Sequence, residues 1–376
     1  MDHFSPHLGT TFEGYYSKFR LPSSASIALI VSAVPAAARK STTHDELVKS
    51  RPFMISFTYV SADSKEYYQK EYWPEKFDIE LKGEKGKDGF RIRWDQGEFG
   101  WDAPSEEEGR HDTVWWKVHT DEIQFEGKTK PTSLEGEGEG ADPSSSRIPW
   151  NPNDPNSTPA GIIARAPLPI QWHVHSLDSP CDFTLNLSTS SNELQVHTQD
   201  QNGSARVHIE KNWAISFPTS YIWIQTRNHH PSKGDSGLCV AGGSLIPGVD
   251  AFLVGYTTPN RFLSYAPPTS TSIFGISLGV TREIRYDKGL VELDLKGWWR
   301  RLKIVATCPQ DTFFHFSAPL NTGHAPDYCA QSFAATVKVE VEERTWPWQA
   351  WTKVDEEVFE KGSLEFGGAY YKSHKD

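Results

Sequence analysis

A chain of 376 residues can bury the core of one large or two medium-sized domains, and we expect two. Its net charge of −11 is spread along the sequence, which argues against a nucleic-acid-binding surface, an anionic-membrane surface and a phosphate-binding protein. The most apolar stretch, Ile27 to Ala38, is too short to cross a bilayer, and no basic leader precedes it. We therefore expect a cytoplasmic protein without stable membrane insertion.

Apolar and charged residues alternate with a period of two in several segments, among them Phe90 to Trp94, Val291 to Leu295 and Val337 to Val341. This pattern predicts half-buried antiparallel strands. Helical periodicity is scarce, with short candidates at Thr43 to Lys49 and Val354 to Lys361. The sequence therefore predicts an all-β fold, a barrel or a sandwich, with few short helices.

A change of composition divides the chain. Residues 127–160 are rich in Gly, Pro, Ser and acidic side chains and cannot bury enough apolar area to order a core. We predict a linker or long loop there, a first β-unit at 1–126 and a second β-unit at 161–376.

The first candidate for chemistry is Glu13. If its segment is extended, Glu13 and Tyr15 share one face and Tyr16 lies on the other. A carboxyl group among aromatic rings either keeps its proton, which makes it a general acid, or is satisfied by backbone N–H groups or a cation such as Lys18 or Arg20. The sequence leaves both alternatives open.

Two histidines form the second candidate. His173 and His175 stand two residues apart on a predicted strand, so their side chains point the same way, next to Trp172. Paired strand histidines can ligate zinc, but no other histidine shows a metal-ligand spacing, so we expect no metal. A role as acid, base or hydrogen-bond donor competes with that of a satisfied core histidine.

The third candidate is a strand in which Tyr221, Trp223 and Gln225 share one face, followed by Arg227 at a rim. An aromatic wall ending in one hydrogen-bonding group is typical of a ligand cavity, and also of a core strand whose Gln satisfies a loop. The sequence contains no GxSxG, Walker, HExxH or Rossmann motif. We therefore expect no cofactor and chemistry that needs only shape, a proton and the exclusion of water.

Several segments together resemble the tocopherol cyclase-like family, namely Phe12-Glu-Gly-Tyr-Tyr16, Glu210-Lys-Asn-Trp213 with Phe217-Pro218, Tyr221-Ile-Trp-Ile-Gln225, Gly242-Gly243 with Pro247-Gly248, and Glu365-Phe-Gly-Gly368. The resemblance implies two lipocalin-like antiparallel β-barrel units packed together, with distant relation to carotenoid hydratases and survival-factor-type proteins. Tyr15, Ala214 and Tyr221 depart from the residues that the family favours, which predicts a reshaped cavity and a different substrate.

The resemblance implies that a prenyl alkene is protonated and that a phenol oxygen then closes a ring. We predict that Glu13 or a cavity histidine delivers the proton, that a wall formed by Trp213, Tyr221 and Trp223 faces the cation, and that Lys211, Asn212 and Gln225 hold the head group. The predicted catalytic residues are Glu13, His173, His175 and Lys211, and the predicted substrate-binding residues are Tyr16, Trp172, Asn212, Trp213, Tyr221, Trp223, Gln225 and Arg227.

Two other functions remain open from the sequence. The same cavity could fold a polyene for a pericyclase or isomerase that polarises its substrate without full protonation. It could also belong to a carrier that binds a lipid or a prenylated metabolite unchanged. The buried acid and imidazole candidates favour an enzyme, because such groups are costly in a protein that only transports.

Overall fold

The computed structural model describes residues 3–41, 43–105, 107, 111–131, 145–151, 157–161, 170–188, 194–215, 217–230 and 234–372. The chain forms two compact units. Unit 1 comprises residues 1–157, 168–217 and 319–325, and unit 2 comprises residues 158–167, 218–318 and 326–376.

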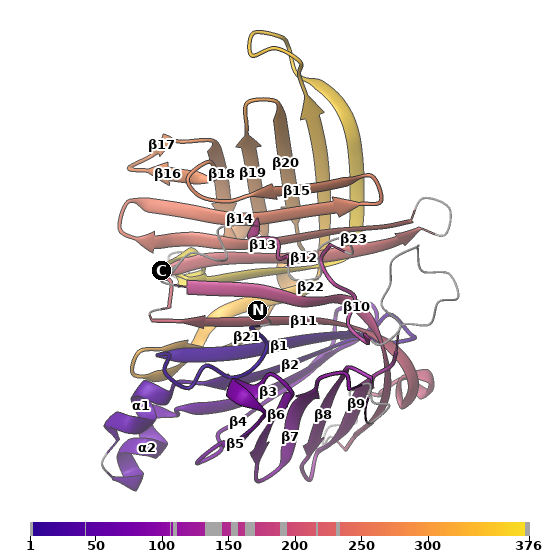
Figure 1. Ribbon diagram of the computed structural model, residues 1–376, viewed down its shortest axis with the longest axis vertical. Coiled ribbons are helices and arrows are strands. Elements are labelled where there is room, and N and C mark those ends of the chain that lie inside the picture. Colours follow the sequence, from indigo (N-terminus) through magenta and orange to yellow (C-terminus); the bar gives the residue numbers. More distant parts are fainter. Residues whose placement is uncertain are drawn as a thin grey trace. The chain divides into compact units, whose positions relative to one another are not determined.

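Unit 1 is built on one antiparallel barrel-like sheet with the strand order β4-β3-β2-β1-β11-β10-β9-β8-β7-β6-β5 (Figure 1). Its strands are β1 Phe12–Arg20, β2 Ser26–Ala33, β3 Phe53–Val60, β4 Tyr67–Tyr72, β5 Asp78–Lys82, β6 Gly89–Trp94, β7 Gly97–Asp102, β8 Thr113–His119, β9 Ile123–Thr129, β10 Ile170–Leu187 and β11 Asn202–Ala214.

The pairing of β10 with β9 and of β11 with β1 corrects the predicted domain boundary. These two strands complete the first sheet, so unit 1 does not end at residue 126 and the second unit does not begin at 161. Of the predicted linker, residues 127–129 belong to β9, whereas 132–144 and 152–156 lie outside the described residues. A composition shift marks an insertion within a sheet as readily as a boundary between two domains.

Unit 2 carries a second antiparallel sheet with the order β17-β16-β14-β13-β12-β23-β22-β20-β19-β18, in which β15 pairs with β14 and β21 with β22. Its strands are β12 Ser220–His230, β13 Gly234–Ile246, β14 Val249–Thr258, β15 Arg261–Tyr265, β16 Thr271–Ile273, β17 Ile276–Ser277, β18 Val280–Arg285, β19 Leu290–Lys296, β20 Arg300–Thr307, β21 Phe314–Leu320, β22 Gly323–Glu343 and β23 Thr352–Gly368. Residues 319–325, which include the end of β21 and the start of β22, belong to unit 1.

The predicted all-β class and the three predicted strands are confirmed: the segments from Phe90, Val291 and Val337 lie in β6, β19 and β22. In each sheet, the alternating pattern places the side chains of one face in a hydrophobic core. In β9, for example, Ile123 and Phe125 are fully buried and Gln124 between them is exposed. The sheet geometry thus follows from the binary pattern of the sequence.

The described residues contain three α-helices, α1 Pro35–Lys40, α2 His44–Ser50 and α3 Ala369–Lys372. Helix α2 confirms the first predicted helix, and the Thr43 side chain caps its N-terminus by accepting a hydrogen bond from the backbone N–H of Glu46. The second predicted helix, Val354 to Lys361, is wrong, since this segment lies within β23 and pairs with β22. No helix among the described residues is long and apolar enough to cross a membrane.

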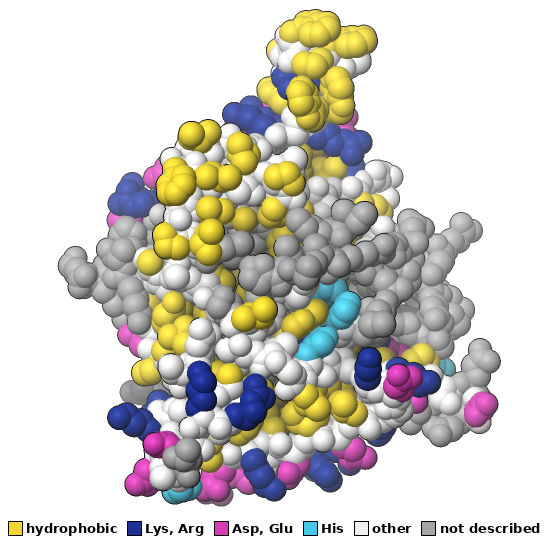
Figure 2. Space-filling view, turned by 60° about the vertical axis from the view of Figure 1, so that its left-hand side comes forward, with side chains coloured by type: hydrophobic (Ala, Val, Ile, Leu, Met, Phe, Trp, Pro, Cys, Tyr) yellow, Lys and Arg dark blue, Asp and Glu magenta, His cyan; other side chains and the backbone are white. Residues whose placement is uncertain are grey.

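Hydrophobic side chains are exposed at the hairpin of β22 and β23, which projects at the top of Figures 1 and 2. Trp346 and Trp348 are 56% and 82% exposed, and their rings stack with centroids 5.6 Å apart. In the same unit, Trp298 is 73% exposed.

Candidate active site

Three neighbouring strands of unit 1 place the predicted catalytic side chains on one face. In the order β1-β11-β10, Glu13 lies opposite Trp213, Tyr15 opposite Lys211, and Lys211 opposite His173. Directly opposed residues in an antiparallel sheet share a face. That face is the inner one. Tyr15 belongs to the hydrophobic core of unit 1, and so do the β11 residues two and four positions before Lys211, which share its face. The structure therefore brings Glu13, Lys211, His173 and Trp213 together, as predicted.

Lys211 is the centre of the cluster. Its side chain is fully buried, and its Nζ lies 2.6 Å from Oε1 of Glu13 and 2.9 Å from Nδ1 of His7. The ammonium group also donates hydrogen bonds to the carbonyl oxygens of His3, at 2.9 Å, and of Ser5. The buried charge is therefore paired and hydrogen-bonded, as a buried cation requires.

Glu13 is also held by His7, at the end of the N-terminal segment His3–His7. The backbone N–H of His7 donates to both carboxylate oxygens, at 3.0 and 2.9 Å, and Nδ1 of His7 lies 3.0 Å from Oε1. Burial alone would raise the pKa of Glu13, but the positive charge of Lys211 and the contact with His7 outweigh burial and hold this pKa below its ordinary value. Glu13 is therefore ionised at neutral pH.

The lowered pKa corrects the prediction that Glu13 keeps its proton and acts as the general acid. Of the two alternatives left open by the sequence, the satisfied carboxylate is the one observed, but the cation is Lys211. Lys18 and Arg20 cannot be this cation. They follow Glu13 by an odd number of residues on β1, so their side chains project from the other face of the sheet.

Aromatic rings enclose the charged cluster. The Lys211 Nζ lies 5.1 Å from the ring centroid of Tyr15 and 5.0 Å from that of Trp213, within the range of cation–π attraction. The His7 ring stacks on Trp213 with centroids 4.4 Å apart. His173 contacts the same indole at 5.2 Å. The site therefore combines an ammonium, a carboxylate and imidazoles within an aromatic wall.

His175 lies next to His173 on the same face. Its ring is 5.9 Å from that of His173 and 4.6 Å from that of Phe4. The predicted pair of histidines on one face is thus observed, although a bulge interrupts the register of β10 after Val174. No motif or periodicity singles out His3 or His7, since both precede β1 in a segment without regular structure.

Three predicted binding residues of unit 1 lie on the other face of its sheet. Tyr16 alternates with Tyr15, and Asn212 and Trp172 stand opposite one another between the inward residues of β11 and β10. The prediction that Lys211 and Asn212 hold one head group is therefore wrong, because adjacent strand residues point to opposite faces. On this outer face Glu210 accepts hydrogen bonds from Nε1 of Trp172 and pairs with Nε2 of His208, both at 2.7 Å.

The remaining predicted binding residues belong to unit 2. Tyr221, Trp223 and Gln225 share one face of β12, as predicted, and it is the face opposite to Ile222 and Ile224, which lie in the core of unit 2. Arg227, on the same face, pairs with Asp235. Of the aromatic residues predicted to form one wall, Trp213 belongs to unit 1, and Tyr221 and Trp223 belong to unit 2.

The face of Tyr221 carries a polar group that the sequence analysis missed. The Tyr221 hydroxyl donates a hydrogen bond of 2.5 Å to Oε1 of Glu365, and Nε2 of Gln331 donates to Oε2 at 2.7 Å. Burial, followed by the neighbouring Cys329 and Glu365, raises the pKa of Tyr221 well above its ordinary value. Glu365 belongs to the Glu-Phe-Gly-Gly segment of the family resemblance, which is the signal that could have identified it.

An open depression of about 330 Å³ lies at the opposite end of β1 and β11. Its lining residues are Arg20, Leu21, Pro22, Pro180, Ser204, Ala205 and Arg206, and no predicted site residue is among them.

Comparison with solved structures places the fold. The crystal structure of CghA matches with a TM-score of 0.55 and 11% identity over 96% of this chain and 88% of that one, and the structure of CghA with Sch210972 matches with 0.53 and 11% over 95% and 88%. Kievitone hydratase from Nectria haematococca matches with a TM-score of 0.45 and 9% identity over 98% of this chain and 91% of that one. The predicted architecture of lipocalin-like barrel units is confirmed. No protein-family pattern and no curated protein sequence matches the chain.

Proposed function

We propose that the chain is a cofactor-independent cyclase or isomerase of a hydrophobic metabolite, of the prenylated phenol or polyene class, with its active site inside unit 1. The observation that carries this proposal is the fully buried ammonium of Lys211, held against Glu13 and His7 among aromatic rings. Buried ion pairs are weak contributors to stability, and clusters of this kind concentrate at functional sites. The fold shared with CghA, crystallised with Sch210972, is compatible with a small-molecule site.

The geometry favours polarisation of the substrate. A positive charge fixed in a water-poor, aromatic environment stabilises negative charge that develops on a carbonyl or phenol oxygen as a ring closes. Lys211 supplies that charge, and Glu13 fixes its position. Nδ1 of His7 faces Lys211 and Glu13, so Nε2 is the nitrogen through which this imidazole would take or give a proton.

Protonation of an alkene is the second candidate, and one observation favours it. The rings of Tyr15 and Trp213 already face a cation at about 5 Å, and the same π-surfaces would stabilise a tertiary carbocation. An imidazolium ion of His7, His173 or His175 would then be the donor, since Glu13 is ionised.

The test is to incubate the purified protein with a panel of prenylated phenols, hydroquinones and polyenes in heavy water and to follow products by mass spectrometry. A ring-closed isomer without solvent deuterium supports polarised cyclisation, and an isomer with one deuteron supports protonation. Binding across the panel without any isomer contradicts the enzyme and identifies a carrier.

A further inference from the structure

The N-terminal segment His3–His7 fills part of the inner face of unit 1. The Phe4 side chain is fully buried in the hydrophobic core, although it precedes the first strand. Its ring is surrounded by five others, here named the aromatic box, whose centroids lie 4.6 to 6.2 Å away. The box consists of Tyr15, Phe90, Phe99, Trp101 and His175.

The backbone around Phe4 accepts hydrogen bonds from two side chains of this face, Lys211 and Tyr15. The carbonyl oxygens of His3 and Ser5 accept from Lys211, and the carbonyl oxygen of Phe4 accepts from the Tyr15 hydroxyl at 2.9 Å. The segment thus presents an aromatic ring beside three carbonyl oxygens. An aromatic metabolite with carbonyl or phenol oxygens offers the same set of groups.

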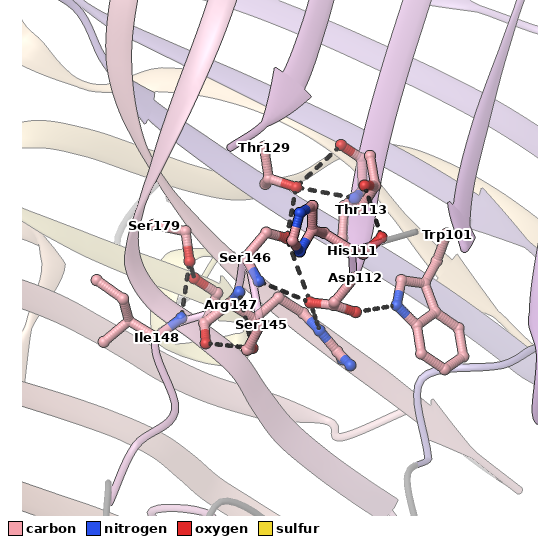
Figure 3. Close-up of polar contacts among 12 residues, drawn as sticks. Trp101, His111, Asp112, Thr113, Thr129, Ser145, Ser146, Arg147, Ile148 and Ser179 are labelled. Atoms are coloured by element: carbon pink, nitrogen blue, oxygen red, sulfur yellow. Dashed lines mark hydrogen bonds and ion pairs between the residues drawn. The ribbon is translucent and has the colours of Figure 1, made fainter. Parts of the chain in front are cut away.

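The guanidinium group of Arg147 lies against the aromatic box and the Phe4 ring. Arg147 lies with its Cζ 5.1 Å from the Phe4 ring centroid and 4.9 Å from that of Trp101. Asp112, which is 2% exposed, accepts from Nε of Arg147 at 3.0 Å and from Nε1 of Trp101 at 2.5 Å (Figure 3). One buried carboxylate therefore orients both the guanidinium and one wall of the box.

The short segment that carries Arg147 is fixed on both sides of this residue. Ser146 bonds through its hydroxyl to Thr129 at 2.7 Å and to Asp112 at 3.2 Å, and the N–H of Ile148 donates to the Ser179 hydroxyl at 2.8 Å (Figure 3). The guanidinium is consequently preorganised, which is what a binding group needs and a surface arginine lacks.

We propose that the space filled by the Phe4 ring is the ring subsite of the substrate, that the part of the N-terminal segment around Phe4 leaves it when the substrate enters while His7 stays beside Glu13 and Lys211, and that Arg147 then binds an oxygen on the substrate ring. This inference rests on the proposed function and specifies its ligand as an aromatic or quinoid ring with at least one acceptor oxygen. Arg147 is a specificity-determining residue in this account, and Asp112 is its positioning residue. The segment in its observed position competes with the substrate.

A reversible disulfide lock tests the displacement. The Ser5 hydroxyl donates to the carbonyl oxygen of Gly86 at 2.6 Å, and a Cβ added at Gly86 would lie 2.9 Å from Cβ of Ser5, so cysteines at both positions need a shift of about 1 Å to reach disulfide geometry. Because Gly86 has a φ of 78°, its substitution also strains the backbone, and the oxidised variant is therefore compared with its own reduced form. The probe is geranylhydroquinone, and its affinity is measured by titration calorimetry on the Ser5→Cys/Gly86→Cys protein, oxidised and reduced. We expect the oxidised form to bind at least ten-fold more weakly than the reduced form, which is the matched control. Equal affinity of both forms overturns the proposal.

Removal of the occupant gives a second test. If the segment fills the subsite most of the time, Phe4→Ala raises the affinity for geranylhydroquinone about ten-fold or more. The reason is that the apparent affinity scales with the fraction of the protein whose subsite is empty. Phe125→Ala, which empties an equally buried position beside Phe19 and Phe57, is the control and leaves the affinity unchanged. A gain of the same size in Phe125→Ala, or no binding by either wild type or Phe4→Ala, contradicts the subsite.

The role of Arg147 is tested by ligand preference. Asp112→Asn/Arg147→Met removes both charges, so that no carboxylate is left buried and unpaired. In this variant the affinity for geranylhydroquinone falls about ten-fold, whereas that for geranylbenzene, which lacks the oxygens, is unchanged. An equal loss for both ligands assigns Arg147 a structural role only. Turnover is followed in the same samples: tight binding without product refutes the proposed function but not the subsite, and product formation by the oxidised lock refutes the subsite but not the function.

Discussion

Replacing Lys211 by Met measures what the ion pair between Lys211 and Glu13 contributes to the free energy of unfolding. The substitution leaves the Glu13 carboxylate, 7% exposed, without its cation, and breaking a buried pair from one side costs about 3–5 kcal/mol. In a domain of 150–250 residues this corresponds to a fall in Tm of roughly 6–20 °C. The double variant Glu13→Gln/Lys211→Met removes both charges and should recover most of that loss.

The assay must report on unit 1 alone. Hydrogen exchange of peptides from β1 and β11 in increasing urea, read by mass spectrometry, gives the free energy of unfolding of these strands. A loss below about 1 kcal/mol in Lys211→Met, or a double variant whose loss equals the sum of the two single losses, would refute the coupling of the two charges.

The same pair has a defined pH dependence. The pKa of Glu13 is lowered in the folded protein, so its contribution is fully present above the unfolded value near 4.5 and is lost as the pH falls through the folded pKa. The stability difference between wild type and Glu13→Gln should therefore be constant from pH 8 to pH 5 and shrink in more acidic solution. A difference that grows on acidification contradicts the ionised state assigned to Glu13.

Three further predictions follow from other buried groups. Burial lowers the pKa of His324 from 6.5 to about 4, so about 3 kcal/mol of stability should disappear as the pH falls from 6.5 to 4, and urea titrations of His324→Gln should lack this loss. Burial raises the pKa of the Cys181 thiol to about 12, so iodoacetamide at pH 8 should modify it only after unfolding, as peptide mapping would show. A Cβ at Gly367 would lie 2.0 Å from Cε1 of Tyr221, so Gly367→Ala should lower the Tm, and adding Tyr221→Ser should restore part of it; no rescue would place the strain elsewhere.

The sequence predicted those parts of the site that depend on local alternation. A period of two placed Glu13 with Tyr15 on one face of β1 and His173 with His175 on one face of β10. What joins them is the cross-strand register, which sets Lys211 between Tyr15 and His173. These partners are distant in sequence and no local pattern encodes their pairing. The charge state of Glu13 was undetermined for the same reason, because its cation lies on another strand.

The errors also have physical causes. Val354 and Val358 stand at a helical spacing, but both are exposed valines on β23, where Phe359 pairs with Val337 of β22. Tertiary pairing here overrides a weak periodicity. His7 left no signal, since it acts from an irregular segment whose position is set by Glu13 and Lys211.

The central claim is that unit 1 holds the active site, and its most direct measurement is turnover of the same substrate panel by two charge-pair variants, one in each unit. Glu13→Gln/Lys211→Met removes the pair in unit 1, and Asp294→Asn/Arg301→Met removes an ion pair of 2.7 Å in unit 2. We predict that the first variant loses product formation by about 100-fold or more while it stays folded, and that the second keeps the wild-type rate. Unchanged turnover in the first variant, or its loss in the second alone, would contradict the account.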